Sequence, residues 1–390
     1  MERAPDYGDW GTLSPEEATE MARAGRGTRD EAPAEVDFVQ LLTPAGERVK
    51  HADYSLDISD DEAKGLYRDM VLIRRVDVEA TSLQRQGQLA LWAQVLGQEA
   101  AQIGAGRALE PDDFSFPGYR EHGIAWCRGI SPAQSARSFR QVTNGGWDPY
   151  EFNHAEPSIV IGNNALNAVG YAMGVQHDGA ETAVMVCIGD GAMSQGDIAE
   201  SFVWASVFQA PVVFLLQNNH WAISEPTERQ TRIPLYKRAD GFGFPGVRVD
   251  GNDVFAMLAV TRAALARARE GSGPTLVEAY TYRMGAHTTS DDPTRYRILA
   301  EVEEWQRKDP IDRLRAYLVS TGAADQAWLE SIDAEADLAA RELRDAVLSM
   351  VGPTPISIFD HVYAEPHPLI DEERAEMVAL LGAEEAGSLK

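Results

Sequence analysis

The amino-acid sequence predicts an α/β fold with a mostly parallel sheet and helices on both faces. Short apolar segments rich in branched residues occupy the centre of the chain, and Gly, Asp, Asn or Pro bound them, as in buried parallel strands. Helical patterns alternate with these segments, which is typical of right-handed βαβ units. The predicted strands span residues 183–188, 211–216 and 275–280.

The helices can be justified in chain order. Ser59 is a good N-cap with Glu62 three positions later, and apolar residues then recur at helical spacing, which predicts a long helix. A further helical pattern follows over 97–104. Residues 197–210 have the length of a crossover helix between the first two strands, and 256–269 follow a short strand and a turn. The last 90 or so residues are mostly helical in pattern and strongly charged.

The chain is predicted to fold as one main domain with two flanking segments. Residues 1–55 mix Pro, Gly, Ala and acidic groups without sustained periodicity, which predicts a flexible acidic N-terminal arm. Residues 56–365 form the α/β domain with its helical C-terminal part, and 366–390 form a C-terminal tail.

Composition excludes several classes of protein. The 390 residues are 44% hydrophobic and 25% charged, and no apolar run approaches the roughly 20 residues of a membrane-spanning helix. The formal net charge of −26 disfavours binding to nucleic acid or to anionic lipid. No secretory or transit signal is visible, so we expect a cytoplasmic protein. The two cysteines cannot form a zinc cluster or a disulfide framework.

Polar residues gather where two predicted strands end. Gly189, Asp190 and Gly191 follow the first strand, and Asn219 follows the second. Ligands of parallel sheets bind at the carboxyl ends of the strands, so these turns should lie side by side. Carboxylate, amide and backbone carbonyl oxygens suit Mg²⁺, and backbone N–H groups at the start of a helix suit phosphate. We therefore expect a site for Mg²⁺ and a diphosphate.

A Gly-Asp-Gly sequence alone usually marks only a turn after a strand. Its spacing to Asn-Asn at the end of the next strand makes the combination specific, and the pair resembles the thiamine diphosphate fingerprint. The sequence has no Gly-Lys-Ser/Thr loop for a mononucleotide. Glycines at 189, 191 and 196 do not fit the G-x-G-x-x-G pattern of dinucleotide sites.

The resemblance extends over roughly residues 60–365. Gly-Tyr-Arg-Glu-His-Gly from Gly118, Val-Asp-Gly-Asn-Asp-Val from Val249 and Ala-Tyr-Thr-Tyr-Arg-Met-Gly-Ala-His from Ala279 are similar to the α subunit of 2-oxo acid dehydrogenases. Within that family, Tyr-Arg-Glu, Ala-Tyr-Thr-Tyr-Arg and Thr-Ser-Asp-Asp (residues 289–292) look closest to the branched-chain type, with the pyruvate type as the near rival. The resemblance implies the thiamine diphosphate-binding fold.

Site residues carry over motif by motif. The resemblance implies that Tyr119 and Arg120 hold the diphosphate, and that Ile161 wedges the cofactor into a bent conformation. Asp190 and Asn219 would bind Mg²⁺ with their side chains. The other residues implied are Trp221, whose backbone carbonyl completes the metal site, His287, which acts in catalysis, and Gly189, Gly191, Ala192 and Ile223, which contact the cofactor.

The resemblance also implies the activity and the partners. A separate β subunit would complete an α2β2 heterotetramer, in which a branched-chain 2-oxo acid is decarboxylated and its acyl group passes to a lipoyl group on an acyltransferase core. A pyruvate dehydrogenase or an acetoin-cleaving enzyme is the alternative, and a catalytically silent interaction protein is a third hypothesis. Two positions depart from the family: Gln217 stands where branched-chain members often have Arg, and Gly118 where some relatives have Gln.

Overall fold

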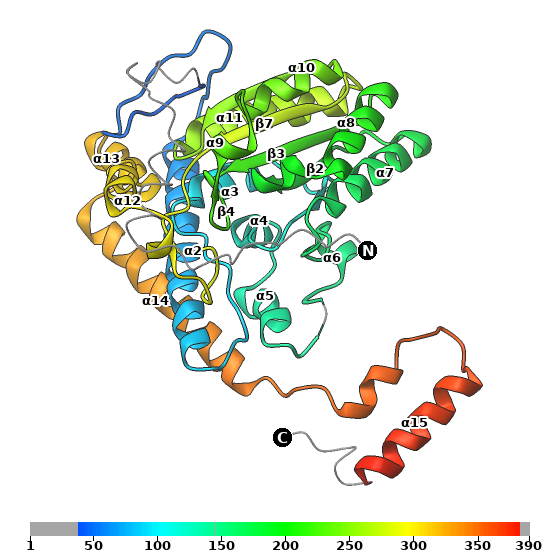
Figure 1. Cartoon of the computed structure of the whole chain (residues 1–390). Helices are drawn as coiled ribbons and strands as arrows, with labels where there is room; N and C mark the ends of the chain where they lie inside the picture. Colours follow the sequence, from blue (N-terminus) through cyan, green and yellow to red (C-terminus); the bar gives the residue numbers. More distant parts are fainter. Residues whose placement is uncertain (1–37, 144, 383–390) are drawn as a thin grey trace, which may run out of the picture.

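A five-stranded parallel sheet forms the centre of the computed structural model, which describes residues 38–143 and 145–382 (Figure 1). Its strand order is β1-β2-β3-β7-β6, and every neighbouring pair is parallel. The predicted fold class is therefore confirmed, with strand ends within two residues of the predicted ones. The strands are β1 (Phe114–Phe116), β2 (Val184–Gly189), β3 (Val212–Asn218), β6 (Gly246–Asp250) and β7 (Thr275–Tyr280).

Alternation along the strands divides the core into two layers. Met185 and Leu215 point to one face, and Val186 and Phe214 point to the other, as the two-residue period of a strand requires. Helices with apolar stripes cover both faces, so the central strands are buried on both sides. The first face packs against α2 (Asp60–Arg85), α3 (Glu99–Gly106) and α11 (Val254–Arg269), and the second against α7 (Asn163–Asp178), α8 (Gly196–Phe208) and α10 (Arg238–Phe242).

Side-chain caps fix where several helices begin. Ser59 and Glu62 form the predicted capping box of α2, and Ser131 and Gln134 form another at α5 (Pro132–Phe139). The helices and short elements not yet given are α4 (His122–Cys127), α6 (Pro149–Phe152), η1 (Gly191–Ser194), β4 (Trp221–Ala222), β5 (Glu225–Pro226), α9 (Thr227–Gln230), η2 (Leu235–Lys237) and η3 (Pro293–Arg295).

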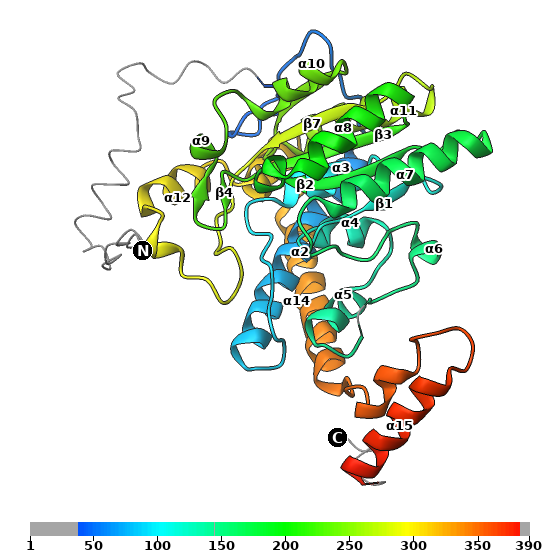
Figure 2. The ribbon, with the colours of Figure 1, turned by 45° about the vertical axis from the view of Figure 1, so that its right-hand side comes forward.

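The C-terminal part is helical, as predicted. It comprises α12 (Leu299–Gln306), α13 (Pro310–Ser320), α14 (Gln326–Ser349), η4 (Pro355–Phe359) and α15 (Pro368–Leu381). The long helix α14 packs along α2. In Figure 2, η4 and α15 project away from the sheet domain, and all residues of α15 are partly or fully exposed. The predicted tail thus contains a helix of 14 residues, while its last residues, 383–390, lie outside the described part.

The N-terminal boundary differs from the prediction. Val39, Leu41 and Leu42 are buried in the core, so the expectation of a loose arm is wrong for residues 38–55. Val39 pairs with Val249 beside β6, and the N–H groups of Leu41 and Leu42 donate to Asp253, each at 2.6 Å. Anchoring by a few contacts far along the chain leaves no periodic pattern in the segment itself. Residues 1–37 of the predicted arm lie outside the described residues.

None of the helices in the described part of the chain is long and apolar enough to span a membrane. The cytoplasmic location stays a prediction.

Candidate active site

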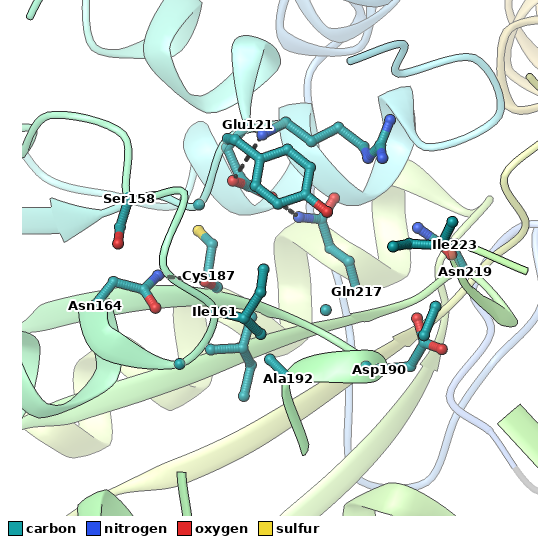
Figure 3. Close-up of a pocket in the computed structure, with 18 of the residues that line it drawn as sticks. Glu121, Ser158, Ile161, Asn164, Cys187, Asp190, Ala192, Gln217, Asn219 and Ile223 are labelled. Carbon is teal, nitrogen blue, oxygen red and sulfur yellow. Dashed lines mark hydrogen bonds between the residues drawn. The ribbon is translucent and has the colours of Figure 1, made fainter. Parts of the chain in front are cut away.

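A cavity of about 270 Å³ opens at the carboxyl ends of β2 and β3, where the sequence places the site. All of the predicted site residues line it, so the structure brings together motifs that are up to 168 positions apart, from Tyr119 to His287. Figure 3 shows Asp190, Asn219 and Ile223 at one end and Ser158 and Asn164 at the other. The lining includes Tyr119, Arg120, Ile161, Gly189, Asp190, Gly191, Ala192, Asn219, Trp221, Ile223 and His287.

The turn after β2 presents Asp190 and a helix start to the cavity. Asp190 is buried, and its Oδ2 accepts hydrogen bonds from Thr227 Oγ1 at 3.1 Å and Gln230 Nε2 at 3.2 Å. Burial raises the pKa of Asp190, because a carboxylate loses hydration there. A cation bound in the cavity would favour the ionised form. Gly191 lets this turn lie against the neighbouring hairpin, since a Cβ at Gly191 would come within 2.7 Å of the Ala222 Cβ.

The turn after β3 presents Asn219. Its Oδ1 accepts from the backbone N–H of Trp221 at 3.3 Å, and its Nδ2 donates to Gln98 Oε1 at 3.0 Å. Both Asn219 and Gln98 are buried. The oxygen of Asn219 therefore lies on the side of Trp221, whose own carbonyl is the third predicted metal ligand.

Arg283, which follows β7, connects the turn after β3 to the loop of His287. Its guanidinium is buried and donates to the carbonyls of Trp221 at 2.8 Å and Ile223 at 2.7 Å, and to Tyr296 Oη at 3.0 Å. A carbonyl oxygen has two lone pairs, so the bond to Trp221 leaves that oxygen able to bind a metal as well. Ile223 has a φ of 57°, which is rare for a β-branched residue. The bond from Arg283 helps to hold it in that conformation at the cavity mouth.

Arg120 also lines the cavity, next to Tyr119. Its Nη1 donates to the Gln94 carbonyl at 2.6 Å and its Nη2 to the His287 carbonyl at 2.8 Å. The guanidinium carbon also lies 5.5 Å from the centre of the Tyr119 ring. These bonds leave part of the planar donor fork facing the cavity, where it suits an anionic oxygen.

His287 contacts both arginines. Its Nδ1 lies 3.3 Å from Arg120 Nη2 and 3.3 Å from Arg283 Nη1. Burial, and then the positive charges of Arg120 and Arg283, lower the pKa of His287 to about 4. The ring is thus neutral at pH 7, and because Nδ1 faces two donors, its proton lies on Nε2. The backbone N–H of His287, rather than its ring, ties the loop to Asp291 at 2.9 Å.

The apolar wall comes from the segment before α7. Ile161 and Val160 are 39% and 68% exposed, so the predicted wedge residue is available to a ligand rather than packed in the core. Gly162 follows with a φ of 86° and precedes α7 as its N-cap. This left-handed turn favours glycine and directs the chain from the cavity wall into the helix.

Glu121 and Gln217 form a buried, hydrogen-bonded pair in the wall of the cavity (Figure 3). Gln217 Nε2 donates to Glu121 Oε1 at 2.6 Å, and Gln217 Oε1 accepts from Gln102 Nε2 at 3.1 Å. Burial raises the pKa of Glu121. The departure at Gln217 therefore has a structural use: its amide ties the end of β3 to the Tyr-Arg-Glu turn.

Sequence reasoning gave no role to several polar lining residues, among them Gln98, Asn164 and Arg283. Gln98 belongs to a predicted helical pattern. Gly97-Gln-Glu nevertheless places two polar residues at the start of a helix of small and apolar residues, and that contrast could have indicated a functional role. Arg283 lies inside the Ala-Tyr-Thr-Tyr-Arg motif, but the sequence gave no reason to assign it a role. Cys187 also lines the cavity, and burial raises the pKa of its thiol well above the ordinary value, so it is not a nucleophile.

Among the described residues, no group of three or more His, Cys, Asp and Glu side chains could hold a metal ion. The predicted Mg²⁺ site does not require one, because it uses one carboxylate, one amide and one backbone carbonyl.

A parallel α/β sheet with a polar cavity at its strand ends defines a broad class of ligand-binding enzymes. The family model described as "Dehydrogenase E1 component" matches residues 67–348, which is more than half of the chain. The chain belongs to this family, and the family resemblance stated from the motifs is confirmed.

Curated relatives align along most of the chain. It is 44% identical to the 3-methyl-2-oxobutanoate dehydrogenase subunit alpha of Mycobacterium tuberculosis (strain ATCC 25618 / H37Rv), over 89% of this chain and 95% of the relative. It is 39% identical to the pyruvate dehydrogenase E1 component subunit alpha of Bacillus subtilis (strain 168), over 79% of this chain and 82% of the relative. It is 37% identical to the pyruvate dehydrogenase E1 component subunit alpha of Acholeplasma laidlawii, over 80% of this chain and 91% of the relative.

Proposed function

We propose that this chain is the α subunit of a branched-chain 2-oxo acid dehydrogenase that depends on thiamine diphosphate and Mg²⁺. The observation that carries the proposal is the convergence of Asp190 and Asn219, from adjacent strand ends, with Arg120 and His287 in one cavity. The family supports the reaction class, and the 44% identity to a 3-methyl-2-oxobutanoate dehydrogenase subunit supports the branched-chain substrate.

The residues present fit the cofactor and the metal. Oxygen atoms of Asp190, Asn219 and Trp221 form a ligand set that suits Mg²⁺. Arg120 and the backbone N–H groups of Gly191 and Ala192, at the start of η1, suit a diphosphate. When bound, the cofactor supplies a thiazolium ring that accepts the electron pair left by departing CO₂.

The chain's own residues would orient the cofactor and donate a hydrogen bond to the substrate. Ile161 and Ile223 line the apolar part of the cavity and would orient the ring system of the cofactor. His287, neutral with its proton on Nε2, would donate to the substrate carboxylate or to an oxygen that becomes negative during the reaction. One preorganised donor of this kind is worth about 10²-fold or more in rate.

We propose a β subunit as an obligatory partner, in an α2β2 heterotetramer, and a lipoyl-bearing acyltransferase core as the acceptor of the acyl group. The part of the chain that the structure describes has one parallel sheet, and its cavity is open at the strand ends. The outer face of α8 also exposes Trp204 and Phe208, which stack on each other with ring centres 5.3 Å apart. Large apolar residues in a group are typical of protein interfaces.

Pyruvate is the alternative substrate, because relatives named as pyruvate dehydrogenase subunits are 37–39% identical to this chain. The deciding experiment reconstitutes the chain with its β subunit and measures thiamine-dependent CO₂ release with 3-methyl-2-oxobutanoate, 4-methyl-2-oxopentanoate, pyruvate and acetoin. We expect the branched substrates to give the largest kcat/KM. A higher kcat/KM for pyruvate, or cleavage of acetoin, would change the assigned substrate. Absence of any thiamine-dependent turnover would overturn the proposal.

A further inference from the structure

We infer that Gln98 is a positioning residue of the metal and diphosphate site: it orients the amide of Asn219 and offers its own amide N–H to the diphosphate. The inference rests on the proposed function. Gln98 is fully buried at the start of α3 and lines the cavity.

The orientation of Asn219 follows from its two contacts. The backbone N–H of Trp221 needs an acceptor, so the atom of Asn219 facing it at 3.3 Å is Oδ1. Its Nδ2 then points to Gln98, which must present Oε1, at 3.0 Å. Gln98 thereby keeps the oxygen of Asn219, and not its nitrogen, on the side where the metal ligands gather. A flipped amide would place N–H donors against a cation.

The other polar atom of the Gln98 amide, Nε2, is not used in the contact with Asn219. Nε2 is buried and has no hydrogen-bond partner within residues 38–143 and 145–382. Leaving a buried donor unpaired is energetically costly, so such a group usually has a partner that is bound in function. The cavity is where that partner would lie, and a diphosphate oxygen or a Mg²⁺-bound water accepts from an amide N–H.

The turn that carries Gln98 is held from several sides. Gly97 has a φ of 94°, and a Cβ there would come within 2.4 Å of the Tyr282 carbonyl oxygen. Glu99 accepts from the Gly97 N–H at 3.0 Å and from Arg74 Nε at 2.8 Å. Thr281 Oγ1 donates to the Gly97 carbonyl at 2.9 Å. A side chain on a turn fixed in this way can impose its orientation on a neighbour.

The test uses the reconstituted α/β assembly and measures affinity by calorimetry, separately for Mg²⁺ and for thiamine diphosphate. Gln98→Met keeps the length of the side chain and removes both amide groups. We expect Mg²⁺ to bind about tenfold more weakly, which corresponds to about 1.4 kcal/mol. In an Asn219→Ala background, the same substitution should change Mg²⁺ affinity less than twofold, because the ligand through which Gln98 acts is gone.

Gln98→Glu examines the donor role. The carboxylate still accepts from Asn219 but faces the diphosphate with a negative charge and no N–H, so we expect thiamine diphosphate to bind at least tenfold more weakly. Gln326→Met, an exposed amide on α14, is the matched control and should leave both affinities unchanged. Thermal unfolding of each ligand-free assembly shows whether a variant is folded.

The outcomes separate the two proposals. If the wild-type assembly binds no thiamine diphosphate, the proposed function fails. If the wild type binds and Gln98→Met stays within twofold for both ligands, the role of Gln98 is wrong and the proposed function stands. Equal losses of Mg²⁺ affinity with and without Asn219 would also overturn the orienting role, because Gln98 would then act independently of that ligand.

Discussion

Two parts of the site, which we name the Asp190 end and the His287 end, are held by different chemistry. At the Asp190 end, the side-chain oxygens accept from neutral donors: Thr227 and Gln230 donate to Asp190, and the backbone of Trp221 donates to Asn219. At the His287 end, two guanidinium groups face the ring. One end thus keeps acceptor oxygens ready for a cation, while the other keeps an imidazole uncharged and able to donate. A net charge of −26 reveals nothing of this local arrangement.

The largest effect should come from removing the anionic ligand at the first end. We expect Asp190→Ala to abolish Mg²⁺-dependent binding of thiamine diphosphate, because the phosphate charges would face a site with no carboxylate-bound cation. Calorimetry of the α/β assembly measures this, with Asp197→Ala at the exposed start of α8 as control. Unchanged affinity in Asp190→Ala would remove the metal assignment.

Substitution at the His287 end should change turnover and not cofactor affinity. We expect His287→Ala to lower turnover about 10²-fold or more while cofactor affinity changes less than threefold, because the lost group is a donor to the reacting atoms. Decarboxylation with an artificial electron acceptor and acylation of a lipoyl group are measured separately. If both rates stay within about twofold of the wild type, about 0.4 kcal/mol of barrier, His287 has no catalytic role.

Arg283 contacts both ends, so its substitution tests whether they are independent. Arg283→Lys retains the charge but loses the fork that reaches Trp221 and Ile223 together. We expect roughly tenfold losses in both cofactor affinity and kcat, in contrast to the two single-ended variants. Arg295→Lys, within η3, is the conservative control. A loss confined to one quantity would show that Arg283 serves one end only.

Acid should lower the stability of the folded chain. Burial lowers the pKa of His122 to about 4 and the pKa values of His154 and His220 to about 3. The folded chain then binds fewer protons than the unfolded chain from about pH 6.5 downward, so stability is complete above pH 6.5 and is lost as the pH falls. Each buried histidine contributes up to about 1.4 kcal/mol per pH unit.

Urea denaturation at pH 7.5 and pH 5.5 checks this prediction. The free energy of unfolding should be lower at pH 5.5, and His154→Gln should reduce the difference. The ring of His154 forms a hydrogen bond with Ser115 Oγ and does not line the cavity that contains His287, so this variant isolates the stability effect from the catalytic one. Equal stability at both pH values would contradict the lowered pKa values.

The sequence alone predicted the parts of the site whose signals are local. Strand ends, the Gly-Asp-Gly turn and the Asn-Asn pair each lie within a few residues, so periodicity and turn chemistry were sufficient to place Asp190 and Asn219. Gln98 and Arg283 were missed because their partners are distant: Gln98 lies 121 positions from Asn219, and Arg283 lies 60 from Ile223. Such pairings depend on how the strands meet, which no local pattern encodes.

The anchoring of residues 38–42 has a consequence for synthesis on the ribosome. Asp253 accepts from Leu41 and Leu42, and Arg313 donates to the Leu42 carbonyl across 271 positions. At about 5–20 residues per second, the ribosome needs roughly 15–55 s to deliver that arginine after Leu42 has been made. Residues 38–42 therefore complete their docking only after the whole sheet has been translated. Until then, their apolar side chains are not fully buried.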